Sequence, residues 1–248
     1  MKYNPFSLSG KFILVTGASS GIGKVVALEC SKMGANVIIT GRNKERLNET
    51  FQSLEKNENH LLIVADLSNK ENLDSLVLQI PKLDGIVHCA AMLKKVPFKF
   101  LNEKSWAETI ETNLYAPAIL SQLLFKNNKI NLNASIVFIS SIASKVASFG
   151  NISYMASKGA INSLSRGMAL ELAPKKIRVN TIEPALIKTN LIGSIFSDED
   201  LENYLKKFPL GRFGEPEEVA YAVIYLLSDA TSWITGTIIT IDGGVTLR

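Results

Sequence analysis

The sequence predicts a single α/β domain built on a doubly wound, seven-stranded parallel sheet with helices on both faces. Short apolar runs alternate with longer segments of helical periodicity along the whole chain. The runs are apolar at consecutive positions, as in strands that are buried on both faces of a parallel sheet. We find no internal repeat, low-complexity tract or linker, and 248 residues suffice for one domain with a full core.

The first half of the chain predicts four strands and three helices. The first strand is the apolar run 12–15, and a glycine-rich turn leads from it into a helix over 21–33, which ends at Gly34. Three similar runs predict further strands at 37–39, 61–64 and 86–89. The segments between these runs predict helices near 43–56 and 69–80.

The second half continues the alternation with a longer helix over 103–126, in which Pro117 predicts a kink or a break. The remaining elements are strand 135–140, helix 151–173, strand 177–182, helix 216–228 and strand 237–241. Right-handed crossovers between such strands place helices on both faces of one sheet.

The stretch 186–213 interrupts this rhythm. It begins with scattered apolar side chains and continues into a short polar helix near 198–207. The apolar residues are Leu186, Ile187, Leu191, Ile192, Ile195 and Phe196. A long, partly apolar excursion after the carboxyl end of a strand is typical of a segment that covers a binding site. We therefore expect a substrate lid here.

The composition excludes several classes of protein. Hydrophobic residues make up 46% and charged residues 20%, which argues against disorder, and no apolar run reaches the 18 residues of a membrane span. The N-terminus has no apolar signal core, and Cys30 and Cys89 fall on a predicted helix and strand, so we expect reduced thiols and a cytoplasmic protein. The net charge of +4 is spread over scattered lysine pairs, which predicts no nucleic-acid site. A mildly basic balance suits an anionic cofactor or an acidic carrier.

A glycine-spaced turn at 16–23 lies between the first strand and the first helix. Gly17 permits a tight turn, Gly21 lets the backbone approach a pyrophosphate, and Gly23 lets helix and strand pack closely. The helix N-terminus then offers free N–H groups to a phosphate. A purely structural turn is the alternative interpretation. A Walker-type loop is excluded, because five residues separate Gly17 from Gly23 and Val25 replaces the Ser or Thr that would bind magnesium.

Tyr154 and Lys158 form a second pattern. Residues four apart share a helix face, so the two side chains are neighbours on the predicted helix 151–173. A free phenol titrates near pH 10, and a neighbouring ammonium group favours the phenolate and lowers that pKa. Ser141 stands thirteen residues upstream, at the end of a predicted buried strand. The sheet can bring this trio to the same edge as the glycine turn.

These motifs together resemble the short-chain dehydrogenase/reductase family, from about Ser9 to Gly244. The likeness extends beyond the glycine turn and the Tyr-x-x-x-Lys pair to several shorter motifs in the same order. They are Asp66 after the third strand, Asn113, Ser140-Ser141, Arg178-Val179-Asn180 with Pro184, Thr235-Gly236, and Ile241-Asp242-Gly243-Gly244. The stretch 211–220 is most similar to the 3-oxoacyl-carrier-protein reductase-like branch. The resemblance implies a Rossmann-type fold with a cofactor-binding half over about 9–115 and a catalytic and substrate-binding half over about 116–248.

The resemblance also implies an oxidoreductase that moves hydride between a nicotinamide and a carbonyl or secondary alcohol. Tyr154 would be the general acid/base, Ser141 would hold the substrate oxygen, and Lys158 would bind the nicotinamide ribose. Asn113 would support a water relay to Lys158. No metal is expected. The cofactor-binding residues implied in this way are Gly17, Ser19, Ser20, Gly21, Ile22, Gly23, Arg42, Asp66, Leu67, Ala90, Tyr154, Lys158, Pro184, Ile187 and Thr189.

The residues after the second strand favour NADP(H) over NAD(H). A fold of this kind that prefers NAD(H) places a carboxylate on the adenosine ribose, and this chain has Gly41 at that point, followed by Arg42. A guanidinium can clamp a 2′-phosphate through two hydrogen bonds. NAD(H) remains possible, because Ser20 stands where phosphate-preferring relatives often carry a second basic residue. Asp66 would face the adenine, cap the next helix, or do both.

Two motifs depart from the family pattern. The chain has His88-Cys89-Ala90-Ala91 where Asn-Asn-Ala-Gly is usual, and Ala185 where a glycine usually follows the proline. We interpret His88 as a structural residue, with a substrate or proton-relay role as the alternative. Ala91 and Ala185 would each narrow the pocket slightly. These changes affect the prediction of the substrate's identity more than the prediction of hydride transfer.

Several functions compete with a ketone or 3-oxoacyl reductase. A sugar, polyol or cyclic alcohol dehydrogenase of the same family is one, and a cofactor-binding regulator without turnover is another. The apolar lid favours an acyl chain or another apolar ketone, and Lys175 could meet an acidic carrier. Apolar faces on 103–126 and 151–173 resemble the helices that pair subunits in the family, so a homotetramer, or at least a dimer, is expected.

Overall fold

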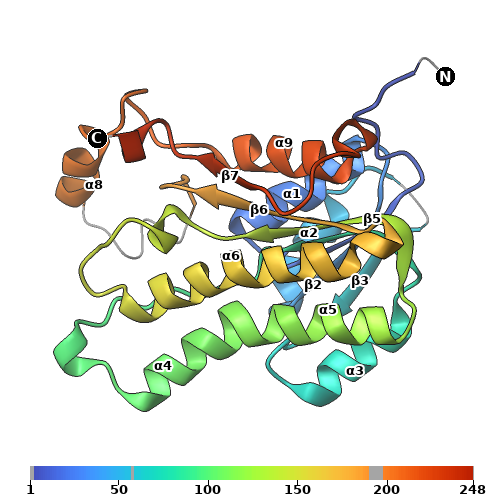
Figure 1. Cartoon of the computed structure of the whole chain (residues 1–248), viewed down its shortest axis with the longest axis horizontal. Helices are drawn as coiled ribbons and strands as arrows, with labels where there is room; N and C mark the ends of the chain where they lie inside the picture. Colours follow the sequence, from blue (N-terminus) through green and yellow to red (C-terminus); the bar gives the residue numbers. More distant parts are fainter. Residues whose placement is uncertain (1–2, 57–58, 190–197, 248) are drawn as a thin grey trace.

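A seven-stranded parallel sheet runs through the middle of the molecule (Figure 1). The computed structural model describes residues 3–56, 59–189 and 198–247, with the side chains of 198–200 left aside. The strand order is β3-β2-β1-β4-β5-β6-β7, and every neighbouring pair is parallel. The strands are β1 (Phe12–Thr16), β2 (Asn36–Gly41), β3 (Leu61–Val64), β4 (Leu83–His88), β5 (Ile130–Ile139), β6 (Arg178–Pro184) and β7 (Ile238–Ile241). The predicted doubly wound parallel sheet is confirmed.

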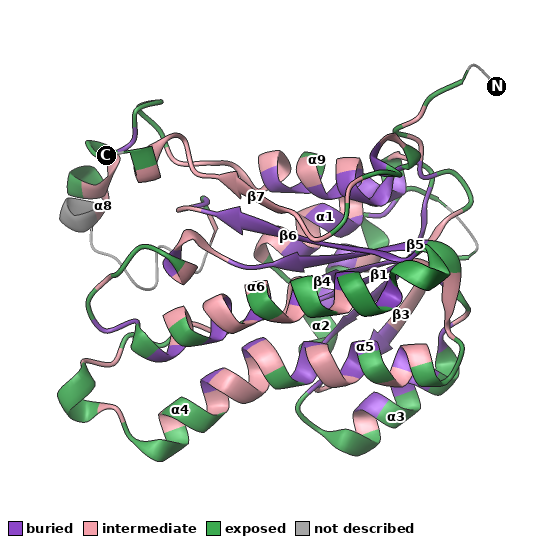
Figure 2. Cartoon of the chain, in the orientation of Figure 1, coloured by how far each residue is buried: buried purple, intermediate pink, exposed green. Residues whose placement is uncertain are grey.

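Helices cover both faces of the sheet, and each face has its own hydrophobic core (Figure 2). One core packs side chains of α1 (Gly21–Lys32), α2 (Lys44–Gln52) and α9 (Pro216–Leu227) against the strands. The other core packs α3 (Lys70–Gln79), α5 (Ala116–Lys126) and α6 (Ile152–Leu172) against the opposite face. Consecutive residues of β1 and β2 are buried because successive side chains enter alternate cores.

The predicted helix 103–126 is two helices with a different turn between them. α4 (Glu103–Ile110) ends in a π-helical turn, η2 (Glu111–Tyr115), and α5 follows. Pro117 lies at the start of α5, where its missing N–H is tolerated. The break anticipated from the proline therefore falls just before it.

Other boundaries shift more modestly. β5 begins at Ile130, five residues before the predicted start, and its register with β4 is irregular between Leu83 and Gly85. The polar part of the stretch 186–213 is helical as predicted, in α8 (Asp198–Leu205). The apolar positions Leu191, Ile192, Ile195 and Phe196 lie outside the described residues. Among residues 3–56, 59–189 and 198–247, no helix is long and apolar enough to cross a membrane.

The order of the strands places a crevice beside β1. The chain winds outward from β1 to β2 and β3, then returns to the other side of β1 for β4 and the later strands. The loops after β1 and β4 therefore leave the sheet on opposite faces. In open parallel sheets, ligands bind in the crevice that opens outside the carboxyl ends of the strands at this switch point.

Candidate active site

A cavity of about 1120 Å³ lies at the carboxyl edge of the sheet. Loops after β1, β2, β3, β4, β5 and β6 line it, together with the first turns of α6 and the end of α8. Every predicted site residue except Asn113 lines this cavity: Gly17, Ser19, Ser20, Gly21, Ile22, Gly23, Arg42, Asp66, Leu67, Ala90, Ser141, Tyr154, Lys158, Pro184, Ile187 and Thr189. The sheet has brought together residues that lie far apart in the sequence.

The glycine turn forms one wall and leaves no room for side chains at two positions. A Cβ on Gly17 would lie 2.8 Å from the backbone of Ala90, and the φ of Gly17 is +66°. A Cβ on Gly23 would lie 2.5 Å from the carbonyl oxygen of Gly17. The N-terminus of α1 therefore packs directly on the turn. The side chain of Ser20, the N-cap residue, makes no capping hydrogen bond. The turn thus offers backbone N–H groups to a ligand.

Two arginines stand at the end of the cavity next to β2. Arg42 follows β2 in the loop before α2, and Arg46 lies in the first turn of α2. Both residues are exposed and line the cavity. The side chain of Asn43 caps α2 by accepting a hydrogen bond from the backbone N–H of Arg46 at 2.8 Å. No carboxylate occupies positions 41–43.

Asp66 stabilises the turn after β3. Its Oδ1 atom accepts hydrogen bonds from the backbone N–H of Ser68 at 3.0 Å and from the Ser68 hydroxyl at 2.7 Å. Desolvation raises the pKa of Asp66, but these hydrogen bonds and the charge of Arg42 outweigh it, so the pKa is lowered overall. The prediction that Asp66 caps the next helix is wrong, because the side chain of Asn69 caps α3 (Lys70–Gln79) and Asp66 holds only the turn before it. Contact of Asp66 with an adenine stays a prediction.

Tyr154 and Lys158 lie in the first turns of α6, at the opposite end of the cavity from the arginines. The Nζ atom of Lys158 lies 5.6 Å from the centre of the Tyr154 ring and donates a hydrogen bond to the carbonyl oxygen of Ile139 at 2.7 Å. The Ser140 hydroxyl donates to the carbonyl oxygen of Lys158 at 3.0 Å. These bonds fix the start of α6 to the end of β5.

Burial shifts the pKa values of this pair in opposite directions. It raises the pKa of Tyr154 to about 12 and lowers that of Lys158 to about 8, because each charged form loses hydration. A hydrogen bond with Ser141 opposes the shift of Tyr154. In the protein without a cofactor, burial therefore dominates the pKa of Tyr154. A lowering of that pKa by the Lys158 ammonium together with the positive ring of an oxidised nicotinamide stays a prediction.

Ser141 lies two residues after β5 and next to Tyr154. Its hydroxyl oxygen accepts a hydrogen bond from the backbone N–H of Ala143 at 3.1 Å and caps the 3-10 turn η3 (Ile142–Ser144). The same hydroxyl is hydrogen-bonded to the Tyr154 phenol. Two hydroxyl groups from different elements thus meet in the cavity wall, where both can contact one substrate oxygen.

Asn113 lies behind the cavity rather than in its wall. It is 2% exposed in the π-helical turn η2. Its Oδ1 accepts from the backbone N–H of Met92 at 2.8 Å, and its Nδ2 donates to the carbonyl oxygen of Met92 at 2.9 Å and to the Ser157 hydroxyl at 3.1 Å. Asn113 therefore ties the loop after β4 to α6, and π-helical turns are frequent at functional sites. A water relay through it stays a prediction.

The unusual His88 lies outside the cavity lining. Its ring stacks on Phe138 with centroids 4.7 Å apart, and its Nε2 atom is 2.8 Å from the Ser121 hydroxyl. Burial lowers the pKa of His88 to about 3, so the ring is neutral. Within the described part of the chain its Nδ1 atom has no hydrogen-bond partner. This environment fits the structural interpretation better than a proton relay.

The cavity also contains residues that the sequence did not point to. Besides Arg46 they come from the loop after β5 and from the C-terminal end: Val146, Phe149, Val245 and Thr246. Tyr204, Lys206, Lys207 and Phe208 also line the cavity and fall within the stretch 186–213. Asp242 folds the C-terminal end back by accepting hydrogen bonds from Gly244 and Thr246.

Comparison with known proteins gives consistent matches over nearly the whole chain. The family model described as enoyl-(acyl carrier protein) reductase matches residues 17–246. The 3-oxoacyl-[acyl-carrier-protein] reductase FabG of Rickettsia bellii is 35% identical, over 96% of this chain and 98% of its own. The NAD-dependent glycerol dehydrogenase of Listeria innocua is 35% identical, over 98% and 96% of the two chains. A short-chain type dehydrogenase/reductase from Mycobacterium marinum superposes with a TM-score of 0.90 at 30% identity, over 98% of each chain.

Proposed function

Because the chain belongs to the short-chain dehydrogenase/reductase family and is an oxidoreductase of that family, we propose that it reduces a ketone or 3-oxoacyl group with NADP(H), or runs the reverse reaction. The observation that carries the proposal is the shared cavity. Tyr154, Lys158 and Ser141 line the same 1120 Å³ space as the glycine turn, at the carboxyl edge of the sheet. A proton donor and a phosphate cradle are therefore available to one bound pair of cofactor and substrate.

The residues present fit a dinucleotide. Gly17 and Gly23 keep the turn free of side chains that would fill it, and the uncapped N-terminus of α1 suits a pyrophosphate. Lys158 lies where it could hold the nicotinamide ribose. Ile187 and Thr189, beyond β6, would contact the carboxamide. When bound, the nicotinamide supplies or accepts the hydride.

The protein's own part in the reaction is the handling of a proton. Tyr154 donates its phenolic proton to the carbonyl oxygen during reduction, and its raised pKa keeps that proton in place at neutral pH. Ser141 donates a hydrogen bond to the same oxygen and orients it. In the oxidation direction Tyr154 must first lose its proton. The positive charges of Lys158 and of an oxidised nicotinamide would then favour the phenolate.

The two arginines support a preference for NADP(H). Arg42 and Arg46 present two guanidinium groups to one end of the cavity, and no carboxylate stands beside them at the end of β2. A 2′-phosphate would be attracted there, whereas the bare ribose of NAD(H) would gain nothing from either charge. Arg46 supplies the second basic residue that Ser20 does not.

The substrate end of the cavity favours an apolar ketone. Its wall includes the apolar side chains of Leu93, Val146, Phe149, Leu186 and Phe208. An acyl chain, free or bound to a carrier, would bury its hydrocarbon against them. A polyol is the second candidate, since the glycerol dehydrogenase of Listeria innocua is as similar to this chain as the FabG relative.

A substrate screen with both cofactors tests the proposal. NADPH or NADH would be followed with an acetoacetyl thioester, a cyclic ketone and dihydroxyacetone, and the reverse reaction with glycerol and a sugar alcohol. We expect the thioester or the cyclic ketone to oxidise NADPH, with kcat/KM at least about tenfold higher than with NADH. Turnover restricted to polyols and NAD would favour the second candidate. Dinucleotide binding without turnover of any compound would favour a regulator.

A further inference from the structure

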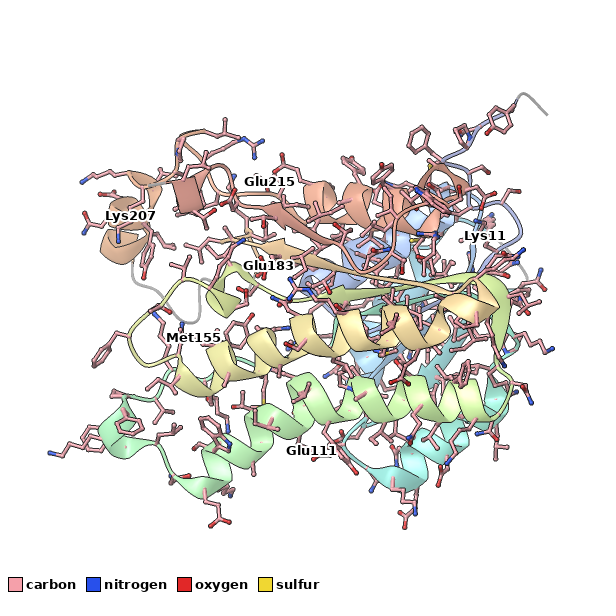
Figure 3. The ribbon with its side chains drawn as sticks, in the orientation of Figure 1. Lys11, Glu111, Met155, Glu183, Lys207 and Glu215 are labelled. Atoms are coloured by element: carbon pink, nitrogen blue, oxygen red, sulfur yellow. The ribbon has the colours of Figure 1, made fainter. Side chains whose placement is uncertain are left out.

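Glu183 is a buried carboxylate that the reaction described above does not use. It lies at the end of β6, is only 2% exposed, and points between the sheet and α6 (Figure 3). Its Oε1 atom accepts hydrogen bonds from the Ser144 hydroxyl and from the Nδ2 atom of Asn162 at 2.6 Å. Its Oε2 atom lies 2.9 Å from the Nζ atom of Lys145 and 3.4 Å from the Thr240 hydroxyl, which donates to it. Four side chains therefore hold one carboxylate.

Three of the four partners of Glu183, namely Ser144, Lys145 and Asn162, belong to the segments that carry the reacting side chains. Ser144 ends the 3-10 turn that Ser141 caps. Asn162 is on α6, four residues after Lys158, so it lies one turn further along the helix face that carries Lys158 and Tyr154. Glu183 thus joins the segment that places one hydroxyl to the helix that places the other.

The carboxylate stays ionised in this environment. Burial by itself raises the pKa of Glu183, but hydrogen bonds from Ser144, Lys145 and Asn162 lower it further than burial raises it. A buried charge whose oxygens are all engaged resists displacement, because moving it would leave a charge and several donors unpaired. Such a group is a stiff link between the elements that it contacts.

We propose that Glu183 is a positioning residue that holds Ser141 against Tyr154, by fixing the segment 141–145 to α6. The inference rests on the proposed function, since it concerns the alignment of the two hydroxyls with a substrate oxygen. Its logic is geometric. A displacement of about 1 Å at a reacting centre can lower a rate about a hundredfold, although the group that moved is not itself a reactant.

The test uses Glu183→Gln and Ser144→Ala, with Thr181→Val as the matched control. Glutamine keeps the size of the side chain, but its amide nitrogen cannot accept a hydrogen bond from Lys145 or Thr240. Thr181 is also buried on β6, two residues away on the same face, and its hydroxyl donates to Ser165 at 2.8 Å instead of holding the Ser141 segment. We expect Glu183→Gln to lower kcat by about tenfold or more while the Kd for NADPH stays within about twofold. Thr181→Val should lower the melting temperature and leave kcat unchanged.

Two further readouts separate positioning from general stability. Ser141 lowers the pKa of Tyr154 through their hydrogen bond, so a displaced Ser141 should move the pH dependence of alcohol oxidation to higher pH in Glu183→Gln and not in the control. Ser144→Ala combined with Glu183→Gln should be no slower than the slower single variant, because both remove the same link. If Glu183→Gln does not fold, Ser144→Ala carries the test, since it keeps the carboxylate and three of its partners.

The rate of amide hydrogen exchange over 141–146 measures how firmly Glu183 fixes this segment, and it does not require an active enzyme. We expect faster exchange there in Glu183→Gln and an unchanged rate in Thr181→Val. Unchanged exchange and an unchanged pH profile in Glu183→Gln would overturn the inference. If the wild-type protein reduces no ketone, the proposed function fails, and the exchange experiment still decides whether Glu183 fixes the segment that carries Ser141.

Discussion

Tyr154 and Lys158 share one face of α6, and burial moves the pKa of each toward its uncharged form. For a proton donor this is useful, because a phenol with a pKa of about 12 keeps its proton at neutral pH. In the oxidation direction Tyr154 must accept a proton as the phenolate, and the raised pKa disfavours that form. A bound, positively charged nicotinamide ring would lower the pKa again. The two directions of the reaction should therefore differ in their dependence on pH.

Alcohol oxidation should accelerate as the pH rises. Oxidation needs the phenolate of Tyr154, whose fraction increases about tenfold per pH unit below its pKa, whereas reduction needs the phenol, which is already present. Lys158 loses its charge above about pH 8, which removes a charge that favours the phenolate, so the gain in oxidation should flatten there. Initial rates in both directions between pH 6 and pH 9.5 check this. A rate of oxidation that is highest below pH 7 would contradict it.

The arginine pair makes a prediction about cofactor choice. Arg42→Ala and Arg46→Ala should each raise the KM for NADPH about tenfold and leave the KM for NADH unchanged, because only a 2′-phosphate contacts a guanidinium. Lys44→Ala is the control, since Lys44 is equally exposed on α2 but lies outside the cavity lining. If all three substitutions raised the KM for NADPH equally, the preference for NADPH would come from general charge attraction and not from contact with the 2′-phosphate.

Local motifs predicted residues that line the cavity where those residues are near neighbours in sequence. Tyr154 and Lys158 are a helix pair, and the glycine turn is eight consecutive residues. Phe149 and Thr246 had no such signal, because the folding of distant segments over the cavity puts them there. The raised pKa of Tyr154 in the protein without a cofactor had no local signal either, because it depends on the protein atoms that surround the phenol.

At the scale of elements, the first strand, its turn and α1 form a unit whose packing depends on missing side chains. Gly23→Ala would place a Cβ 2.5 Å from the Gly17 carbonyl oxygen, so α1 would have to move away from the turn. We expect a lower melting temperature and at least about tenfold weaker NADPH binding. Gly167→Ala is the control. Gly167 is on α6, and a Cβ added there would have no neighbouring atom within 4 Å outside the helix backbone. Alanine also favours a helix by roughly 0.5–1 kcal/mol over glycine. Normal NADPH affinity in Gly23→Ala would contradict the packing argument.

Apolar runs predicted the boundaries of most elements. The prediction failed where polar side chains belong to a strand. The predicted strand 135–140 misses the start of β5, which contains Asn131 and Asn133. The Asn131 side chain donates to Asp84 at 2.7 Å, and Asn133 has a φ of +64°, so this part of the strand is irregular. The π-helical turn before Pro117 is a similar case. A proline signals a break, while the form of the break depends on packing against α6.

At the scale of the whole molecule, large apolar side chains remain exposed outside the cavity. Leu170 on α6 is 78% exposed and Trp233 is 98% exposed. A Cβ on Gly236 would lie 3.7 Å from Ala169, which brings the segment near Trp233 next to the end of α6. Exposed apolar surface of this kind is typical of subunit contacts.

We predict a homotetramer of the 27.1 kDa chain, or at least a dimer. Light scattering coupled to size-exclusion chromatography at micromolar concentration measures the mass directly. Leu170→Ser should shift the population toward smaller species, and Leu78→Ser should not, since Leu78 is similarly exposed but lies on α3, which is not one of the predicted contact helices. A monomeric wild-type protein would contradict this prediction.

The central claim is that the sheet brings a phenol from α6 to a substrate beside a dinucleotide held by the turn after β1. Tyr154→Phe tests it most directly, because it removes one hydroxyl and keeps the ring. We expect turnover in both directions to fall at least about a thousandfold, while the Kd for NADPH, followed by its fluorescence, stays within about threefold. Ketone reduction at an undiminished rate in Tyr154→Phe, with NADPH bound normally, would contradict the account.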